Sequence, residues 1–193
     1  MTRRALLVLA VLLVAMLSTT SWAGVESVSL AYGHEENPVS CHTTATTVAI
    51  AGTTGNTWLK FTDEIFSSDY TRYTLYAGEK GSNLAGLIRT DDAGGLWLGA
   101  NYTAKPAENL TLILRPMKGL SDTSNRGYLF ASYAPKEWGR VSLFGYILAK
   151  EDYRADVVLG PAYNAGKINI IAAPNWAKSG CWYLEVSSTV RFK

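Results

Sequence analysis

The final stretch of the chain, CWYLEVSSTVRFK at residues 181–193, decides the fold class. Every second residue from Trp182 to Phe192 is uncharged, and all of this set except Ser188 are apolar. The residues between them include the charged Glu185 and Arg191. Because successive side chains of a strand point to opposite faces, the alternation predicts one long strand with an uncharged face and a polar face.

Similar alternating segments recur along the chain after residue 24, whereas helical periodicity is almost absent. Their connections alternate between tight turns rich in Gly, Pro and Asn and a second class of loops, which is typical of a meander of antiparallel hairpins. A barrel of 8–10 strands is the alternative, because the first two segments alternate least clearly. Twelve strands are predicted, at residues 26–33, 46–52, 56–62, 70–77, 83–90, 95–104, 109–116, 127–134, 139–150, 153–160, 166–174 and 181–192.

Residues 1–23 have the pattern of a secretory signal peptide. Arg3 and Arg4 precede an apolar run, which is followed by small residues and an A-x-A-like cleavage site ending at Ala23. An uncleaved membrane anchor is the alternative. The predicted organisation is a signal peptide over 1–23 and a single β-barrel domain over 24–193. Without the two arginines, 16 basic residues face 16 acidic ones, so the exported chain is neutral and we expect no nucleic-acid partner.

The distribution of charge indicates which face meets which solvent. In the clearest segments, one face of the strand carries no charged residue. The opposite face mixes charged residues with aromatic residues such as Trp58, Trp97 and Phe144. A soluble barrel would expose those rings to water, but a membrane barrel would enclose them in its lumen. Charges facing lipid cost about 2–4 kcal/mol at the midplane. The pattern favours a closed antiparallel up-and-down transmembrane β-barrel, with a soluble sandwich or lipocalin-like barrel as the alternative.

The signal-peptide pattern, the tight-turn meander and the last strand WYLEVSSTVRFK resemble a small bacterial outer-membrane β-barrel protein of the porin kind. In that group the assembly machinery reads a terminal strand that has alternate apolar residues and a final aromatic. Here Lys193 follows the aromatic Phe192, which departs from the pattern. The resemblance implies a location in the outer membrane of a Gram-negative bacterium, with membrane lipid and the barrel assembly machinery as partners.

The candidate functional residues are the charged residues on the polar faces of the strands, which would face the lumen of a membrane barrel. Four arginines near the loop-side ends of separate strands would form a basic collar in a closed barrel, and unpaired cations in a narrow wall attract anions. The alternative is a structural network of arginines and acids that fills the lumen. The predicted pore-lining residues are Arg72, Arg89, Arg115 and Arg154 of the collar, together with Arg140, Asp156, Glu185 and Arg191.

Cysteine and histidine add little chemistry. The first and last strands of a closed barrel are neighbours, so Cys41 and Cys181 are predicted to form a disulfide, with two unrelated thiols as the alternative. The two histidines, His34 and His42, both fall in the predicted first loop, where a solvated loop is favoured over a metal site. We therefore expect no metal, no cofactor and no enzymatic activity.

The sequence thus predicts a small passive pore of the outer membrane that prefers anions and has small anionic solutes as partners. Two other functions stay open. One is a non-conducting structural or surface-interaction barrel, and the other is a soluble periplasmic ligand-binding β-barrel.

Overall fold

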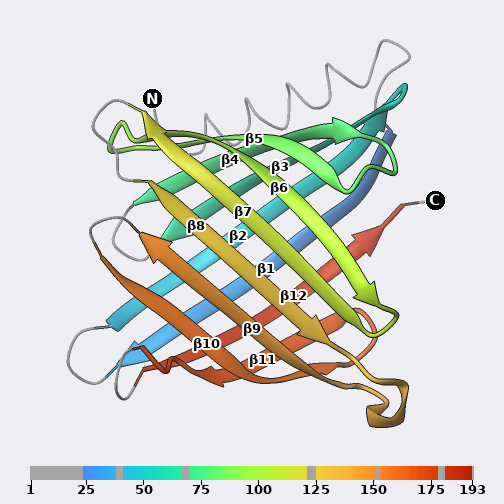
Figure 1. Cartoon of the computed structure of the whole chain (residues 1–193), viewed down its shortest axis with the longest axis vertical. Helices are drawn as coiled ribbons and strands as arrows, with labels where there is room; N and C mark the ends of the chain where they lie inside the picture. Colours follow the sequence, from blue (N-terminus) through green and yellow to red (C-terminus); the bar gives the residue numbers. More distant parts are fainter. Residues whose placement is uncertain are drawn as a thin grey trace.

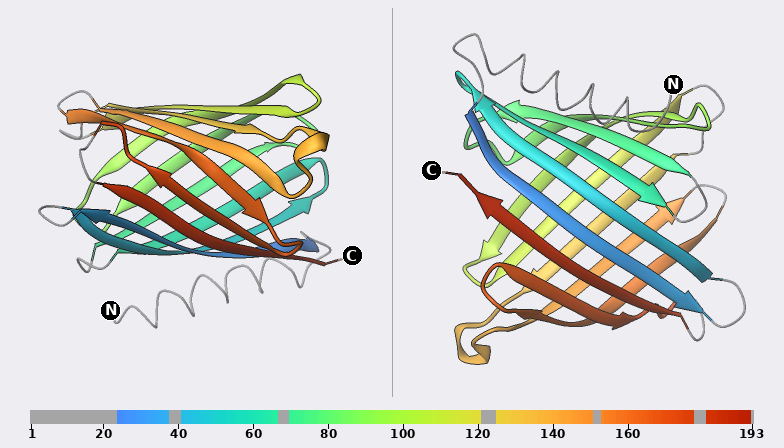
Figure 2. Two further views of the ribbon diagram at one scale, coloured as in Figure 1. Left: turned by 90° about the horizontal axis from the view of Figure 1, so that it is seen from below. Right: turned by 180° about the vertical axis from the view of Figure 1, so that it is seen from behind.

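The protein is a closed barrel of twelve antiparallel strands, in which β1 (Gly24–Asn37) pairs with β12 (Trp182–Arg191) (Figures 1 and 2). The computed structural model describes residues 24–37, 41–66, 70–120, 125–150, 153–177 and 181–192. The predicted fold class is therefore confirmed, including the strand number. The other strands are β2 (Cys41–Thr54), β3 (Thr57–Phe66), β4 (Thr71–Glu79), β5 (Leu84–Asp91), β6 (Leu96–Ala107), β7 (Leu110–Leu120), β8 (Arg126–Tyr133), β9 (Val141–Lys150), β10 (Tyr153–Asn164) and β11 (Ile168–Pro174).

The connections lie at two ends of the barrel, here called the turn end and the loop end. The turn end holds the tight turns that follow β2, β4, β6, β8 and β10, together with the start of β1 and the end of β12. There the Phe192 amide donates to the Glu26 carbonyl at 2.9 Å. Gly81 and Gly166 have φ values of 82° and 80°, a left-handed conformation that favours glycine. A 3₁₀ turn, η1 (Lys136–Trp138), also lies at this end. Within the described ranges, no helix has the length and hydropathy to cross a membrane.

The first hairpin is longer than the sequence predicts. Residues expected in a loop belong to β1 and β2, since Glu35 pairs with Thr43 and Glu36 with His42 in the backbone register. The prediction of a solvated loop was wrong, because backbone pairing between two long strands continues through this polar stretch. The side chains of His34 and His42 lie outside the described residues.

The outer wall is mostly apolar. Its large side chains lie at the alternate strand positions that the sequence predicted to face lipid. Trp182, Val186 and Phe192 are exposed on the outside of the last strand. Other strands expose the same kind of side chain, including Leu75, Leu84, Ile88, Leu98, Leu114, Leu129, Leu143, Ile147, Leu159 and Ile170. A surface of this kind matches a lipid solvent.

Charged residues also lie on the outward face, where Lys118 of β7 is exposed opposite Leu98 and Asp63 lies on β3. β3 extends to Phe66, beyond its predicted end, and Asp63 consequently becomes part of the wall rather than a loop residue. Its residue exposure is 8%, and its Oδ1 has no hydrogen-bond partner among the described residues. The expectation of an outer face without charge is therefore wrong on this strand.

Candidate pore and its lining

Side chains fill a large part of the barrel interior. One apolar cluster lies on the inner faces of β4 to β9, and a second lies on β10 and β11. The space that solutes could use lies beside these clusters. The first cluster consists of Tyr76, Leu87, Trp97, Met117, Tyr128 and Leu148, and the second of Val158, Ala162, Ile171 and Ala173.

A central cavity of about 410 Å³ lies inside the barrel, with lining residues from β1–β5, β7–β9 and β12. Its lining contains four basic residues and two acidic ones, so the wall carries two more positive than negative charges. These residues come from strands far apart in the sequence, and barrel closure brings them together. The charged lining residues are Lys60, Arg72, Arg89, Arg115, Glu64 and Glu185.

Arg72 forms a closed ion pair with Glu64, which lies directly opposite it in the β3–β4 register. Arg72 Nε donates to Glu64 Oε2 and Nη2 donates to Oε1, both at 2.7 Å. The two side chains are 16% and 19% exposed. This bidentate pairing compensates most of the Arg72 charge and fixes both side chains against the wall.

Arg89 is buried and hydrogen-bonded to the wall, so its role is structural. It is 2% exposed, and it donates from Nε to Thr74 Oγ1 and from Nη1 to the Tyr128 hydroxyl, both at 3.0 Å. These bonds connect β5 to β4 and to β8 across the interior. We conclude that the main role of Arg89 is to stabilise the barrel wall rather than to bind a solute.

Arg115 and Lys60 are the two other basic residues that line the cavity, and we call them the central cation pair. Arg115 Nε donates to Asn101 Oδ1 at 3.1 Å, and its guanidinium lies 5.2 Å from the Tyr76 ring centroid and 5.0 Å from that of Phe130. Lys60 Nζ lies 5.8 Å from the same Tyr76 ring centroid. Neither side chain forms an ion pair within 4.0 Å among the described residues. The rings hold the cations in place without neutralising them.

The other predicted lining residues are spread along the barrel. The side chain of Arg154 lies outside the described residues. Asp156 accepts from Asn175 Nδ2 at 3.3 Å, and Glu185 lines the central cavity and accepts from the Tyr183 hydroxyl. Arg191 is exposed at the turn end of β12, and Arg140 lines a separate cavity. The structure thus brings Arg72, Arg89, Arg115 and Glu185 together.

Sequence reasoning missed Glu64 because it assigned this residue to a loop. Its signal was present, since Glu64 shares the parity of Lys60 once β3 is drawn to its full length. The amide of Asn101 was also missed. A neutral residue on the lumen parity gives no sign that it will bind an arginine from the neighbouring strand.

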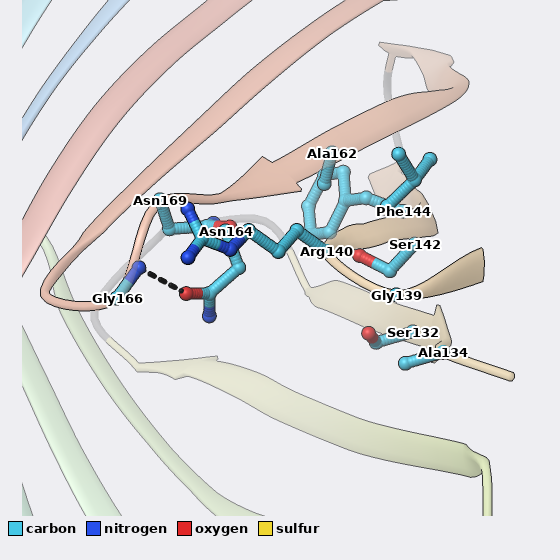
Figure 3. A pocket seen from close by; sticks show the side chains of 11 residues that line it. Ser132, Ala134, Gly139, Arg140, Ser142, Phe144, Ala162, Asn164, Gly166 and Asn169 are labelled. Carbon is cyan, nitrogen blue, oxygen red and sulfur yellow. Dashed lines mark hydrogen bonds between the residues drawn. The ribbon is translucent and has the colours of Figure 1, made fainter. Parts of the chain in front are cut away.

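Two more cavities continue from the central one toward the turn end. The smaller, of about 190 Å³, shares Arg115 and Phe130 with the central cavity. It also shares Ser132 and Phe144 with a turn-end cavity of about 450 Å³ (Figure 3). The shared residues place the three cavities in a row along the inside of the barrel.

Linked aromatic rings follow this row of cavities. Tyr128 stacks on Phe130, Phe130 contacts Tyr146, and Phe144 contacts both Tyr146 and Tyr183, with ring centroids 5.9–6.3 Å apart. Such a row of rings presents an apolar surface along one side of the path.

The predicted Cys41–Cys181 disulfide involves a side chain, that of Cys41, outside the described residues. Cys181 is buried just before β12. The register pairs Asn37 with Cys41 and Glu36 with Trp182, so the end of β1 lies between the two cysteines. Two strand spacings are about 9–10 Å, whereas bridged Cα atoms lie within about 7 Å. No disulfide is found within the described part, and the register argues against this one.

Among the described side chains, no three residues of the His, Cys, Asp or Glu types gather into a possible metal site.

Comparison with known proteins identifies the fold. No family model matches the chain, and no curated protein does. The KdgM porin, solved in complex with disordered oligogalacturonate, is similar with a TM-score of 0.61 at 10% identity, covering 86% of this chain and 99% of that one. The outer membrane protein Omp33 of Acinetobacter baumannii is similar with a TM-score of 0.53 at 9% identity, covering 90% and 100%. The chain therefore has a porin fold, and the predicted resemblance is confirmed at that level.

Proposed function

We propose that this chain is a passive channel of the bacterial outer membrane that passes small solutes and prefers anions. The observation that carries the proposal is the central cavity, whose lining has four basic residues against two acidic ones. The apolar outer wall and the porin fold support a membrane location and a channel rather than an enzyme. Fixed positive charge in a narrow path raises the local concentration of anions.

The preference should come chiefly from the central cation pair. Glu64 compensates Arg72, and Arg89 is buried behind its hydrogen bonds to Thr74 and Tyr128. Lys60 and Arg115 remain, and both face the cavity. This proposal narrows the predicted collar of four arginines to one arginine and one lysine.

Carboxylates are the solute class to test beside chloride. The KdgM porin was solved with oligogalacturonate, which carries carboxylate groups. We extend to the present chain only this chemical class, because guanidinium and ammonium groups both bind carboxylates.

The test is the reversal potential of single channels across a potassium chloride gradient in a planar bilayer. We expect the parent protein to favour anions and the Lys60→Gln/Arg115→Gln double variant to lose most of that preference. Lys118→Gln is the matched control, because Lys118 is an exposed residue of β7 outside the cavity lining. A parent channel without anion preference, or a double variant that keeps it, would refute the proposal.

A non-conducting structural barrel is the second candidate, because two apolar clusters and the tie at Arg89 fill part of the interior. Folded protein that inserts into bilayers without conducting would favour it. The soluble ligand-binding barrel is disfavoured by the exposed apolar outer wall. Recovery of the chain from the soluble periplasmic fraction, without heat-modifiable migration on a gel, would support that third function instead.

A further inference from the structure

The turn-end cavity is built differently from the central one. Residues of β8, β9, β10 and β11 line it, and its volume is about 450 Å³. Figure 3 shows Arg140 reaching from the start of β9 across the cavity toward Asn169. Ser132 and Ser142 add hydroxyl groups, and Phe144 and Ala162 add apolar surface.

Arg140 is the only charged residue in the lining of this cavity, and its described surroundings hold no carboxylate partner. Two described ion pairs lie at this end, and neither includes Arg140: Lys136 Nζ lies 2.6 Å from Glu108 Oε1, and Lys80 Nζ lies 3.9 Å from Glu26 Oε1. Glu137 lies three residues before Arg140 but forms no ion pair with it among the described contacts. The cavity therefore combines an uncompensated guanidinium with neutral hydrogen-bonding groups.

The backbone that carries Arg140 is fixed. The Arg140 carbonyl accepts from the Asn164 amide at 2.8 Å, which ties β9 to the end of β10. The Asn164 side chain is committed to its own turn, because its Oδ1 accepts from the Gly166 amide at 2.9 Å. Asn169, Ser132 and Ser142 are thus the neutral polar side chains placed to assist a ligand on Arg140.

Phe144 supplies an apolar surface in the lining that it shares with Arg140. Its ring stacks on Tyr183 with centroids 6.2 Å apart and planes inclined by 18°, which fixes it against the wall. Phe144 also lines the smaller cavity, so it stands at the junction between the turn-end cavity and the rest of the row. A ligand held by its carboxylate at Arg140 can place an apolar group against this ring.

We infer that the turn-end cavity is a second anion-binding site, which takes a small carboxylate bearing an apolar group. The carboxylate binds the Arg140 guanidinium through two parallel hydrogen bonds, and the apolar group packs on Phe144. The inference goes beyond the proposed function, since a binding site here does not require that the barrel conduct. In a conducting barrel, it would hold an anion at one end of the path.

The test is benzoate binding to the folded, detergent-solubilised chain, measured by equilibrium dialysis, with acetate as the carboxylate that lacks a ring. We expect Arg140→Gln to weaken benzoate binding about tenfold or more, because it removes a charge-assisted bidentate contact. We expect Phe144→Leu to weaken benzoate binding and to leave acetate binding nearly unchanged. Lys136→Gln is the matched control, since it removes a basic residue from the same end without changing the cavity lining.

Three results would overturn the inference. They are a parent chain that binds no benzoate, an Arg140→Gln chain that binds it as tightly as the parent, and a Lys136→Gln chain that loses as much affinity as Arg140→Gln. Heat-modifiable migration on a gel shows that each variant is folded, and Phe144→Leu still tests the site if Arg140→Gln does not fold. A parent that binds benzoate but does not conduct would contradict the proposed channel and leave this site standing.

Discussion

Glu64→Gln should shift the selectivity of the proposed channel toward anions and should also lower the free energy of unfolding of the barrel. The substitution replaces the carboxylate that pairs with Arg72 by a neutral amide of nearly the same shape. It changes the lining of the central cavity from four basic and two acidic residues to four and one. Arg72 then contributes a charge that the parent protein compensates.

The two magnitudes follow from the geometry of the pair. A unit charge about 5 Å from an ion in water interacts with it by about 0.8 kcal/mol, which is about fourfold in anion occupancy. Breaking a buried pair costs about 3–5 kcal/mol. The side chains keep 16% and 19% exposure. Because glutamine also retains one acceptor for Arg72, we expect the free energy of unfolding to fall by about 2 kcal/mol.

Two measurements on the same preparation test this prediction. The reversal potential across a salt gradient reports selectivity, and urea unfolding followed by gel mobility reports stability. Glu108→Gln is the control, since Glu108 pairs with Lys136 at 2.6 Å on the exposed turn end, away from the central cavity. An unchanged reversal potential, or an equal shift in both variants, would show that the Arg72–Glu64 pair does not influence the ion selectivity of the channel.

Two further predictions concern the outer wall. Leu114→Arg, near the middle of β7, should lower the free energy of unfolding by about 2–4 kcal/mol. Leu84→Arg, at the turn end of β5, should lower it by only about 0–1 kcal/mol. Equal losses of stability in urea unfolding would contradict a lipid-facing wall in which the cost of a charge depends on its depth. Asp63→Leu should raise the free energy of unfolding by about 1 kcal/mol, because it removes an outward carboxyl oxygen without a described partner. A loss of stability in that variant would show that Asp63 has a partner in the membrane.

The sequence by itself determined the strands and their two faces. All twelve predicted segments coincide with observed strands, and Trp182, Val186 and Phe192 lie on the outside as their parity requires. The physical reason is local, since alternation along a strand is fixed by backbone geometry and needs no distant contact. The prediction for the end of the first hairpin was wrong, because two strands can stay paired through a polar stretch whose composition is typical of a loop.

Only the tertiary structure decided which charges remain available. Arg72 and Arg115 share one sequence pattern, an arginine on the lumen parity, yet their environments differ. Arg72 meets Glu64 because the β3–β4 register places them opposite each other. Arg115 meets Asn101 and the rings of Tyr76 and Phe130, which come from three other strands. Parity tells which side a residue faces, but register and barrel closure determine its neighbours, and those neighbours decide whether a charge is compensated or open to a solute.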